Sequence, residues 1–297
     1  MSSADVAVGV FRKLEPEDYR VLVAIKLGMG KHEYAPESDL PNLSGLTRRQ
    51  IVFRLDRLSK MDLIRRWVGS YVGYVLSTVG YDCLAINALV KSDVLAAFGK
   101  PLGVGKESDV YDALAPNDER VAVKFHRLGR ASFRQTRRVR GYVADRRHSW
   151  LYQSRLAAEK EYEALELVFP CGVSVPKPVG QNRHVVVMGM IEGGELYHAQ
   201  ELPEPEKVLD EVLENVKTAY QRAGVVHADL SEYNVILKPD FHVLIIDWPQ
   251  FVTRNHPNAG ALLERDVHNV LQFFQKRFRV KRDLQQTLDS IKKPEKA

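Results

Sequence analysis

The chain has 297 residues, a formal net charge of +5 and a hydrophobic content of 45%, which is ordinary for a globular protein with one or two domains. No apolar run approaches the length of about 20 residues that a membrane-spanning helix needs, and the polar N-terminus does not resemble a signal peptide. Cys83 and Cys171 stand far apart without a metal-binding spacing. We therefore expect reduced thiols, a cytoplasmic location and no membrane partner.

The first ninety residues predict a small helical domain that ends in a β-hairpin. Helical patterns cover residues 16–26 and 48–58, with a short polar segment between them. Residues 63–77 then predict two short strands around a glycine-containing turn. Such an order is typical of a winged helix-turn-helix. A further helical stretch, residues 76–90, reads as the linker to a second domain, so the first domain spans residues 1–92.

Arginines mark the predicted second helix of this motif as a candidate nucleic-acid surface. Arg48 and Arg49 stand at its start, where contacts to phosphates and base edges are made in such domains. Arg65 and Arg66 flank the hairpin. The alternative is that these arginines form a solvated face on a module that docks to protein.

A glycine-rich turn lies between the next two predicted strands. Gly103, Gly105, Lys106, Glu107 and Ser108 are its candidate ligand contacts, because glycines let backbone N–H groups approach phosphates. The turn is not a Walker A loop, since Glu107 follows Lys106 where Ser or Thr is required. Ser108 stands where the third glycine of a protein-kinase loop would be. Taken alone, this turn is better explained as a plain hairpin.

The strand after this turn carries a lysine in the pattern V-A-V-K. Lys124 stands where kinases place the lysine that holds the α- and β-phosphates. A buried lysine needs a carboxylate partner, and the predicted helix at residues 150–168 offers Glu161 within its apolar stripe. We predict that Glu161 pairs with Lys124. The alternative is a surface helix that carries an arbitrary glutamate.

A basic segment separates Lys124 from that helix. It contains one acid and eight arginines, namely Arg127, Arg130, Arg134, Arg137, Arg138, Arg140, Arg146 and Arg147. The segment has no sustained apolar period, so it cannot build a core. Its charge suits RNA phosphates, with Arg134, Arg137 and Arg138 as candidate contacts. The alternative is a basic loop without a ligand.

An apolar strand then runs into a short linker. In a kinase, such a linker joins the two lobes and its backbone hydrogen-bonds adenine. Met188 would stand at the back of the nucleotide pocket, and Gly189, Met190 and Ile191 would provide the backbone contacts.

The strongest chemical signal is H-x-D-x-x-x-x-N at His227 to Asn234, followed by Asp247 after an apolar run. Asp229 is placed to accept or orient the proton of an attacking hydroxyl, and Asn234 and Asp247 to hold Mg²⁺ on phosphates. This spacing matches the kinase catalytic signature. A polar turn before a hydrophobic strand would explain the Asp229 and Asn234 pair alone, but not the whole set.

The residues after Asp247 depart from the pattern of an ordinary protein kinase. The sequence continues Trp248-Pro249-Gln250 where D-F-G is expected, and the remaining chain, with a predicted helix at residues 261–278, is too short for a full C-terminal lobe. With G-x-G-K-E-S at residues 103–108 and I-D-x-P-Q at residues 246–250, the chain resembles the RIO atypical protein kinases, and its winged helix resembles their second subfamily.

This resemblance implies an α+β fold, with a winged helix-turn-helix domain followed by a trimmed, two-lobed kinase-like domain at residues 93–297. The lobes would meet near residue 190, giving an N-lobe at 93–190 and a C-lobe at 191–297. It implies that Asp229 is catalytic, that Asn234 and Asp247 bind Mg²⁺ (or Mn²⁺), and that the lysine and serine named above contact ATP.

The resemblance also implies a cellular role. Family members act in small-ribosomal-subunit maturation, by serine/threonine phosphorylation, autophosphorylation or ATP hydrolysis with phosphate passing through the Asp247 position. We expect the precursor subunit and its rRNA as partners, a protein or the chain itself as acceptor, Ser132 as an autophosphorylation candidate, and a monomer. Ala228 stands where glycine is usual and Gly189 where an acid is common. The lack of a eukaryotic-type extension resembles archaeal members.

Two other functions stay open. Small-molecule phosphotransferases of the aminoglycoside or choline kinase type also use H-x-D-x-x-x-x-N and I-D-W, but they need a larger helical lobe. An RNA-binding assembly factor with a nucleotide switch would hydrolyse ATP without transfer to any protein.

Overall fold

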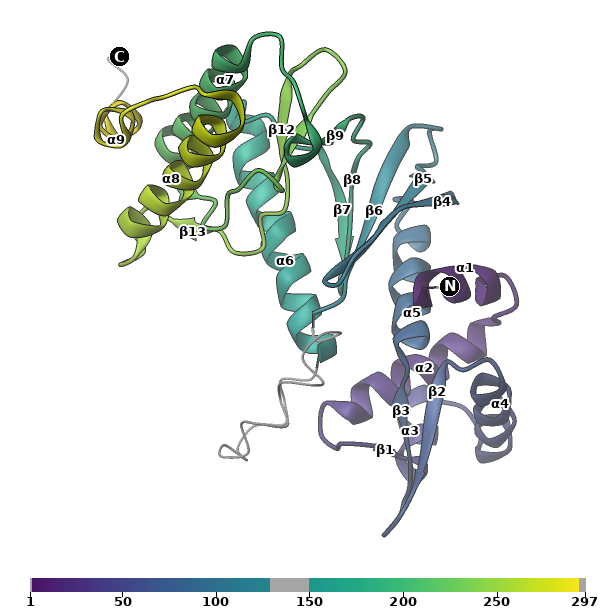
Figure 1. The fold of residues 1–297 in the computed structure, drawn as a ribbon. Coiled ribbons are helices and arrows are strands. Elements are labelled where there is room, and N and C mark those ends of the chain that lie inside the picture. The colour runs from purple at the N-terminus through teal and green to yellow at the C-terminus, as the bar shows by residue number, and fades with distance from the viewer. Residues whose placement is uncertain (1, 129–149, 294–297) are drawn as a thin grey trace. The chain divides into compact units, whose positions relative to one another are not determined.

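The computed structural model describes residues 2–128 and 150–293 and confirms the predicted mixture of helices and sheets (Figure 1). Contacts divide the chain into two compact units, Met1–Leu156 with Gln181–Val185, and Ala157–Gly180 with Val186–Ala297. The predicted domain boundary at residue 92 was drawn from sequence motifs, whereas the two units are defined by contacts between residues. The boundary therefore stays a prediction.

The first part of the first unit is the predicted winged helix. Figure 1 shows β2 and β3 side by side as the wing hairpin, and β1 completes a three-stranded antiparallel sheet in the order β1-β3-β2. The sequence did not predict helix α1. The elements are α1 (Ser3–Phe11), α2 (Pro16–Met29), β1 (Ala35–Pro36), η1 (Glu37–Asp39), α3 (Leu40–Ser44), α4 (Arg48–Lys60), β2 (Ile64–Val68), β3 (Val72–Leu76) and α5 (Thr78–Lys91).

Helix α4 begins where the sequence indicates, because Thr47 and Gln50 form a capping box. Two of its arginines do not form a solvated face. Arg54 Nη1 lies 3.2 Å from Oδ1 of the buried Asp18 in α2, and Arg57 Nε lies 3.2 Å from its Oδ2. These ion pairs fasten α4 to α2, so both arginines stabilise the domain.

The second part of the first unit is an antiparallel sheet formed by β4 (Ala97–Val104), β5 (Ser108–Leu114) and β6 (Arg120–His126). Strand β6 is buried from Val121 to His126, whereas most of β4 is exposed. The exposed β4 and the turn after it therefore form an open edge, and the core of the sheet lies under β5 and β6.

Arg127, directly after β6, corrects the interpretation of the basic segment. The sequence suggested that it opens a run of solvated arginines. Its side chain is only 1% exposed and pairs with Asp82 and Asp109, so Arg127 belongs to the folded core. The other arginines of the segment lie in residues 129–149, outside the described residues.

The second unit contains most of α6 and all the later helices. Its short strands pair in the orders β12-β11-β9 and β10-β13, and α7 and α8 lie side by side (Figure 1). The remaining elements of the chain are α6 (Trp150–Val168), η3 (Phe169–Cys171), β7 (Pro178–Asn182), β8 (Val185–Gly189), β9 (Gly194–Glu195), η4 (Leu196–His198), α7 (Pro205–Thr218), η5 (Ala219–Ala223), β10 (Val225–Val226), β11 (Val235–Leu237), β12 (Val243–Ile245), β13 (Val252–Thr253), α8 (Ala259–Phe278) and α9 (Leu284–Lys292).

Helix α7 continues into the π-helical turn η5 and ends at Gly224, whose φ of +69° suits glycine. Helix α9 was not predicted. Cys83 and Cys171 are free thiols, the first buried and the second half-buried. Among the described residues, no helix combines the length and apolarity needed to cross a membrane.

Candidate active site

The glycine-rich turn of the first unit is open to solvent. Residues 103–107 are exposed and Ser108 is half-buried. The Gly105 N–H donates to the Ser108 carbonyl at 2.8 Å, which closes the turn. A Cβ added at Gly103 would meet no atom within 4 Å. The backbone of this turn is therefore accessible to a ligand, as a phosphate-binding turn requires.

Lys124 and Glu161 are both buried, as their predicted roles require. Lys124 lies on β6 with 9% of its surface exposed, and Glu161 lies on α6 with 2% exposed. Glu161 shares its buried face with Ala158, Leu165 and Val168, which confirms the apolar stripe. Because the two residues belong to different units, their pairing stays a prediction.

The predicted linker has one backbone group already in use. Met188 is buried at the end of β8, whereas Gly189, Met190 and Ile191 are half-buried. The Gly189 N–H donates to the Lys177 carbonyl at 2.8 Å. If this linker binds adenine, the N–H groups that remain for it are therefore those of Met190 and Ile191.

The β11–β12 hairpin of the second unit brings Asp229, Asn234 and Asp247 into one loop cluster. Val235 pairs with Ile245 in the hairpin, and the Ile246 N–H donates to the Asn234 carbonyl at 2.9 Å. The Asn234 side-chain amide donates to the Asp229 carbonyl at 2.8 Å. Asp229 is exposed, and Asn234 and Asp247 are half-buried, so all three acid and amide groups can reach a ligand.

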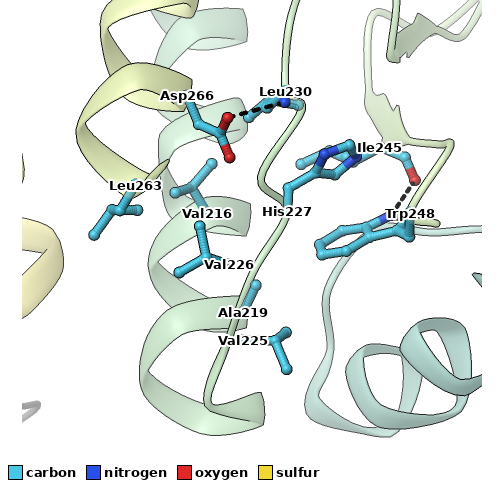
Figure 2. Close-up of a pocket in the computed structure, with 10 residues that line it drawn as sticks. All are labelled: Val216, Ala219, Val225, Val226, His227, Leu230, Ile245, Trp248, Leu263 and Asp266. Atoms are coloured by element: carbon cyan, nitrogen blue, oxygen red, sulfur yellow. Dashed lines mark hydrogen bonds between the residues drawn. The ribbon is translucent and has the colours of Figure 1, made fainter. Parts of the chain in front are cut away.

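His227 contacts the residues on both sides of Asp247. Its Nε2 lies 3.0 Å from the Ile246 carbonyl, which favours Nε2–H donating to that oxygen. Figure 2 shows its ring beside Trp248, with ring centroids 4.5 Å apart, and Trp248 donates to the Ile245 carbonyl at 3.2 Å. Burial lowers the pKa of His227, so the ring is neutral near pH 7. His227 therefore joins the catalytic loop to the strand that precedes Asp247.

Asp266, on helix α8, holds the loop around Asp229, and the sequence motifs did not reveal it. Its carboxylate accepts the N–H of Ala228 at 2.7 Å and that of Leu230 at 3.1 Å, and Figure 2 shows it pointing at the loop. Two α8 neighbours bind the carbonyls of the same loop residues, Arg265 that of Ala228 and Asn269 that of Leu230. The backbone on both sides of Asp229 is thus fixed by one helix.

Asp266 is also electrostatically unusual. It is 1% exposed, and burial raises its pKa to about 6, although the two N–H groups and Arg265 act in the opposite direction. A carboxylate whose pKa lies near neutrality can change protonation in the working range of an enzyme. Its protonation state therefore affects how the catalytic loop is held.

Two residues of the cluster have left-handed backbone conformations. Ala228 has a φ of +64° and Asp247 a φ of +66°, which is uncommon for residues other than glycine. Ala228 is the position at which the sequence departs from the glycine expected of the family. The loop therefore stores conformational strain directly beside Asp229.

A small cavity lies beneath the catalytic loop (Figure 2). Its volume is about 10 Å³, which is room for one water molecule at most. Such a space cannot hold a nucleotide, so this cavity belongs to the packing that supports the loop. Its lining residues are Val216, Ala219, Val225, Val226, His227, Leu230, Ile245, Trp248, Leu263 and Asp266.

The donor set of the cluster fits Mg²⁺. Asp247 offers a carboxylate and Asn234 an amide oxygen, and Mg²⁺ is usually held by one or two protein oxygens together with substrate phosphates. In the described parts of the chain, no group of three or more His, Cys, Asp or Glu side chains could hold a metal by itself. A site that phosphates complete is consistent with both observations.

The predicted nucleic-acid contacts divide into two sets. Arg48 and Arg49 are exposed at the start of α4, as a binding role requires. The second set, Arg134, Arg137 and Arg138, lies outside the described residues together with Ser132. Nucleic-acid contact at either set stays a prediction.

Comparisons with known proteins agree with the motifs. A family model described as the RIO domain matches residues 109–287. A second model, described as the N-terminal domain of Rio2, matches residues 11–92. The two matches cover most of the chain and confirm the resemblance drawn from the residues.

Individual proteins give the same result. The chain is 43% identical over 254 residues to the RIO-type serine/threonine-protein kinase Rio2 of Methanocaldococcus jannaschii, covering 84% of this chain and 92% of that protein. It is 32% identical to the Saccharomyces cerevisiae serine/threonine-protein kinase RIO2, covering 90% of this chain and 65% of that protein. The crystal structure of a Rio2 kinase–ADP/Mg²⁺–phosphoaspartate complex from Chaetomium thermophilum has a TM-score of 0.82 and 29% identity, covering 95% of this chain and 88% of that chain.

Proposed function

Because the chain belongs to the RIO family of serine/threonine-protein kinases and carries the N-terminal domain of its Rio2 branch, we propose that it phosphorylates serine or threonine, including its own, with ATP and Mg²⁺ in the maturation of the small ribosomal subunit. The observation that carries this proposal is the cluster that Asp229 and Asn234 on one loop form with Asp247 after the β11–β12 hairpin, with Asp266 holding the loop.

Each residue has a role that its position supports. Asp229, which is exposed in the loop, accepts or orients the proton of the attacking hydroxyl. Asn234 and Asp247 hold Mg²⁺, which neutralises charge on the transferring phosphate. Lys124 and the backbone of the glycine-rich turn bind the phosphates of ATP. His227 and Asp266 keep the loop in place.

ATP hydrolysis through a phosphorylated aspartate is part of the proposal. The Chaetomium thermophilum Rio2 kinase was crystallised with ADP, Mg²⁺ and a phosphoaspartate, and we assign the corresponding acceptor in this chain to Asp247. Asp247 follows the end of strand β12 at Ile245 and has a left-handed backbone conformation. An acyl phosphate formed there would be hydrolysed by water to release inorganic phosphate.

The winged helix is the proposed contact to the precursor subunit. Arg48 and Arg49 are exposed at the start of α4, where winged helices contact nucleic-acid backbones. Arg54 and Arg57 are engaged with Asp18, so the expected contact to rRNA rests on the first two arginines. Replacement of Arg48 and Arg49 by glutamine should weaken subunit binding and its salt dependence.

The experiment that tests the proposed reaction uses Mg²⁺ and γ-labelled ATP, with and without small ribosomal subunits. Label is followed separately into protein and into free phosphate, and the stability of protein-bound label to hydroxylamine is measured. Stable label on serine or threonine supports a protein kinase. Hydroxylamine-labile label with phosphate release that the subunit stimulates supports hydrolysis through Asp247.

Variants of matched charge test whether the reaction depends on Asp247. Asp247→Asn should lose both kinds of label, whereas Asp240→Asn, an exposed aspartate on the β11–β12 turn, should keep them. No label and no phosphate release in any condition would contradict the proposal and leave an RNA-binding assembly factor that only senses nucleotide.

A further inference from the structure

A cluster of four buried ionisable side chains lies in the first unit, whereas the catalytic loop belongs to the second. Arg127 is 2% exposed, and its three partners are fully buried. They come from α5, from β5 and from the turn between β7 and β8. Buried charges are costly unless they are paired and hydrogen-bonded. The partners are Asp82, Asp109 and His184.

Arg127 is the centre of this cluster. Its guanidinium donates to both carboxylate oxygens of Asp82, at 2.7 and 2.9 Å, and its Nε donates to Asp109 at 2.9 Å. His184 Nε2 lies 2.7 Å from Asp82, and the ring stacks on Tyr81 with centroids 4.7 Å apart. A planar guanidinium can satisfy this fork of acceptors, and a lysine cannot.

The charges reinforce one another. Burial alone would raise the pKa of Asp82, but the Arg127 guanidinium and the His184 hydrogen bond hold it below its ordinary value. Burial would lower the pKa of Arg127, and the two aspartates more than offset this. The ion pairs are therefore present throughout the physiological pH range.

The cluster reaches the glycine-rich turn on both sides of Ser108. The backbone N–H of Arg127 donates to the Glu107 carbonyl at 2.6 Å, and the Arg127 side chain holds Asp109. Ser108 itself pairs with His126 across the sheet. One arginine thus fixes the residues before and after the serine expected to touch ATP.

The other end of the cluster belongs to the winged-helix part of the chain. Asp82 lies on α5, within the match to the Rio2 N-terminal domain. A second connection runs parallel to it, since the Tyr111 hydroxyl on β5 donates to Asp5 of α1 at 2.8 Å. Strand β5 is therefore held by two separate helices of the N-terminal region.

We propose that Arg127 is a positioning residue for the nucleotide, and that Asp82 makes helix α5 part of the scaffold of the phosphate-binding turn. This inference rests on the proposed function, because it assumes that the turn at residues 103–108 binds ATP. It predicts that nucleotide affinity depends on a buried contact that lies outside the turn and touches no ligand.

The test measures the Kd of a non-hydrolysable ATP analogue with Mg²⁺ by calorimetry on the full chain, well below each variant's Tm. Arg127→Lys keeps the charge but loses the fork and should raise Kd by about ten- to a hundredfold. Asp82→Asn keeps the shape and one acceptor and should raise Kd less. If Arg127→Lys does not fold, Asp82→Asn provides the test instead.

Asp18→Asn is the matched control, because it disrupts a buried ion pair of the same unit that has no contact with the turn. It should lower Tm and leave Kd unchanged. If Arg127→Lys and Asp82→Asn lower Tm but bind the analogue as tightly as the unaltered chain does, the cluster only stabilises the fold and the inference is wrong. If the unaltered chain binds no analogue, the proposed function fails instead.

Discussion

The glycine-rich turn and the catalytic loop carry complementary parts of the predicted chemistry, but the chain holds them in different ways. Three side chains of α8 are hydrogen-bonded to the catalytic loop: Asp266 accepts from two loop N–H groups, and Arg265 and Asn269 donate to loop carbonyls. Residues 103–107 of the turn are exposed, and a single buried arginine, Arg127, holds the base of the turn.

This difference matches what each segment has to do. A catalytic carboxylate has to stand within a narrow range of positions relative to the reacting atoms. Its loop is accordingly fixed by side chains of helix α8. A phosphate-binding turn works through backbone N–H groups that must stay accessible. Substitutions in the two regions should therefore separate loss of turnover from loss of nucleotide affinity.

Apart from substitution of Asp229 itself, the largest effect is expected for Asp266→Ala. The loop would lose its acceptor for two N–H groups, so kcat should fall by about a hundredfold or more, with the Kd for ATP unchanged. The free energy of unfolding should change little. The two lost hydrogen bonds destabilise the folded chain, but removal of a buried carboxylate stabilises it. Steady-state kinetics and ATP binding measure the two effects, and Glu264→Ala, exposed on the same helix, is the control. An altered Kd with unaltered kcat would reverse the comparison.

Asp266 also predicts a pH dependence of stability. Burial raises its pKa to about 6, so the folded chain binds its proton more tightly than the unfolded chain does. The stabilisation from this proton is complete below about pH 4 and is lost as pH rises through about 6, an effect on the order of 3 kcal/mol. Urea denaturation of the unaltered chain and of Asp266→Asn between these pH values should show the difference, and parallel curves would contradict it.

Gly103→Ala tests the open turn. A Cβ there meets no protein atom within 4 Å, so stability should change by less than about 0.5 kcal/mol. The added methyl group would stand where a phosphate approaches, and the Kd for ATP should rise by about tenfold, or 1.4 kcal/mol. Gly9→Ala, equally unhindered but within helix α1, should leave the Kd unchanged and raise the free energy of unfolding by up to about 1 kcal/mol, because alanine favours the helix. An unaltered Kd for ATP in Gly103→Ala would mean that the backbone at this position does not contact the nucleotide.

The smallest effect is expected for Ala228→Gly. A φ of +64° costs alanine about 1–2 kcal/mol in the folded chain, and glycine would remove this strain. Part of the resulting stabilisation is lost, because glycine has more conformational freedom in the unfolded chain. The free energy of unfolding should rise by about 0.5 kcal/mol, which urea denaturation can resolve. Ala261→Gly, exposed within α8, should instead be destabilising by about 1 kcal/mol. A destabilised Ala228→Gly would mean that the loop is not strained.

The motif residues could be predicted from the sequence because their chemistry depends on spacing along the chain. Asp229 and Asn234 lie on one loop, and the β11–β12 hairpin needs few residues to bring Asp247 beside them. The winged helix was predictable for a similar reason, since caps and apolar periods are local signals. These features need no knowledge of long-range contacts.

The supporting residues could not be predicted in this way. Asp266 resembles any other acid on an amphipathic helix, and only the packing of α8 beneath the loop gives it two N–H partners. Arg127 looked like the first arginine of a solvated run because its partners, Asp82 and His184, are 45 and 57 residues away. Pairs at such separations depend on tertiary structure, so a local pattern does not reveal them.

The central claim is that Asp229 carries the chemistry on a loop that the rest of the second unit fixes. The most direct measurement is single-turnover transfer from γ-labelled ATP by the unaltered chain and by Asp229→Asn, with ATP binding measured in parallel. Asp229 is exposed, so the variant should fold and bind ATP normally while transfer slows by about a hundred- to ten-thousandfold. Transfer at the unaltered rate would contradict the assignment of the catalytic loop.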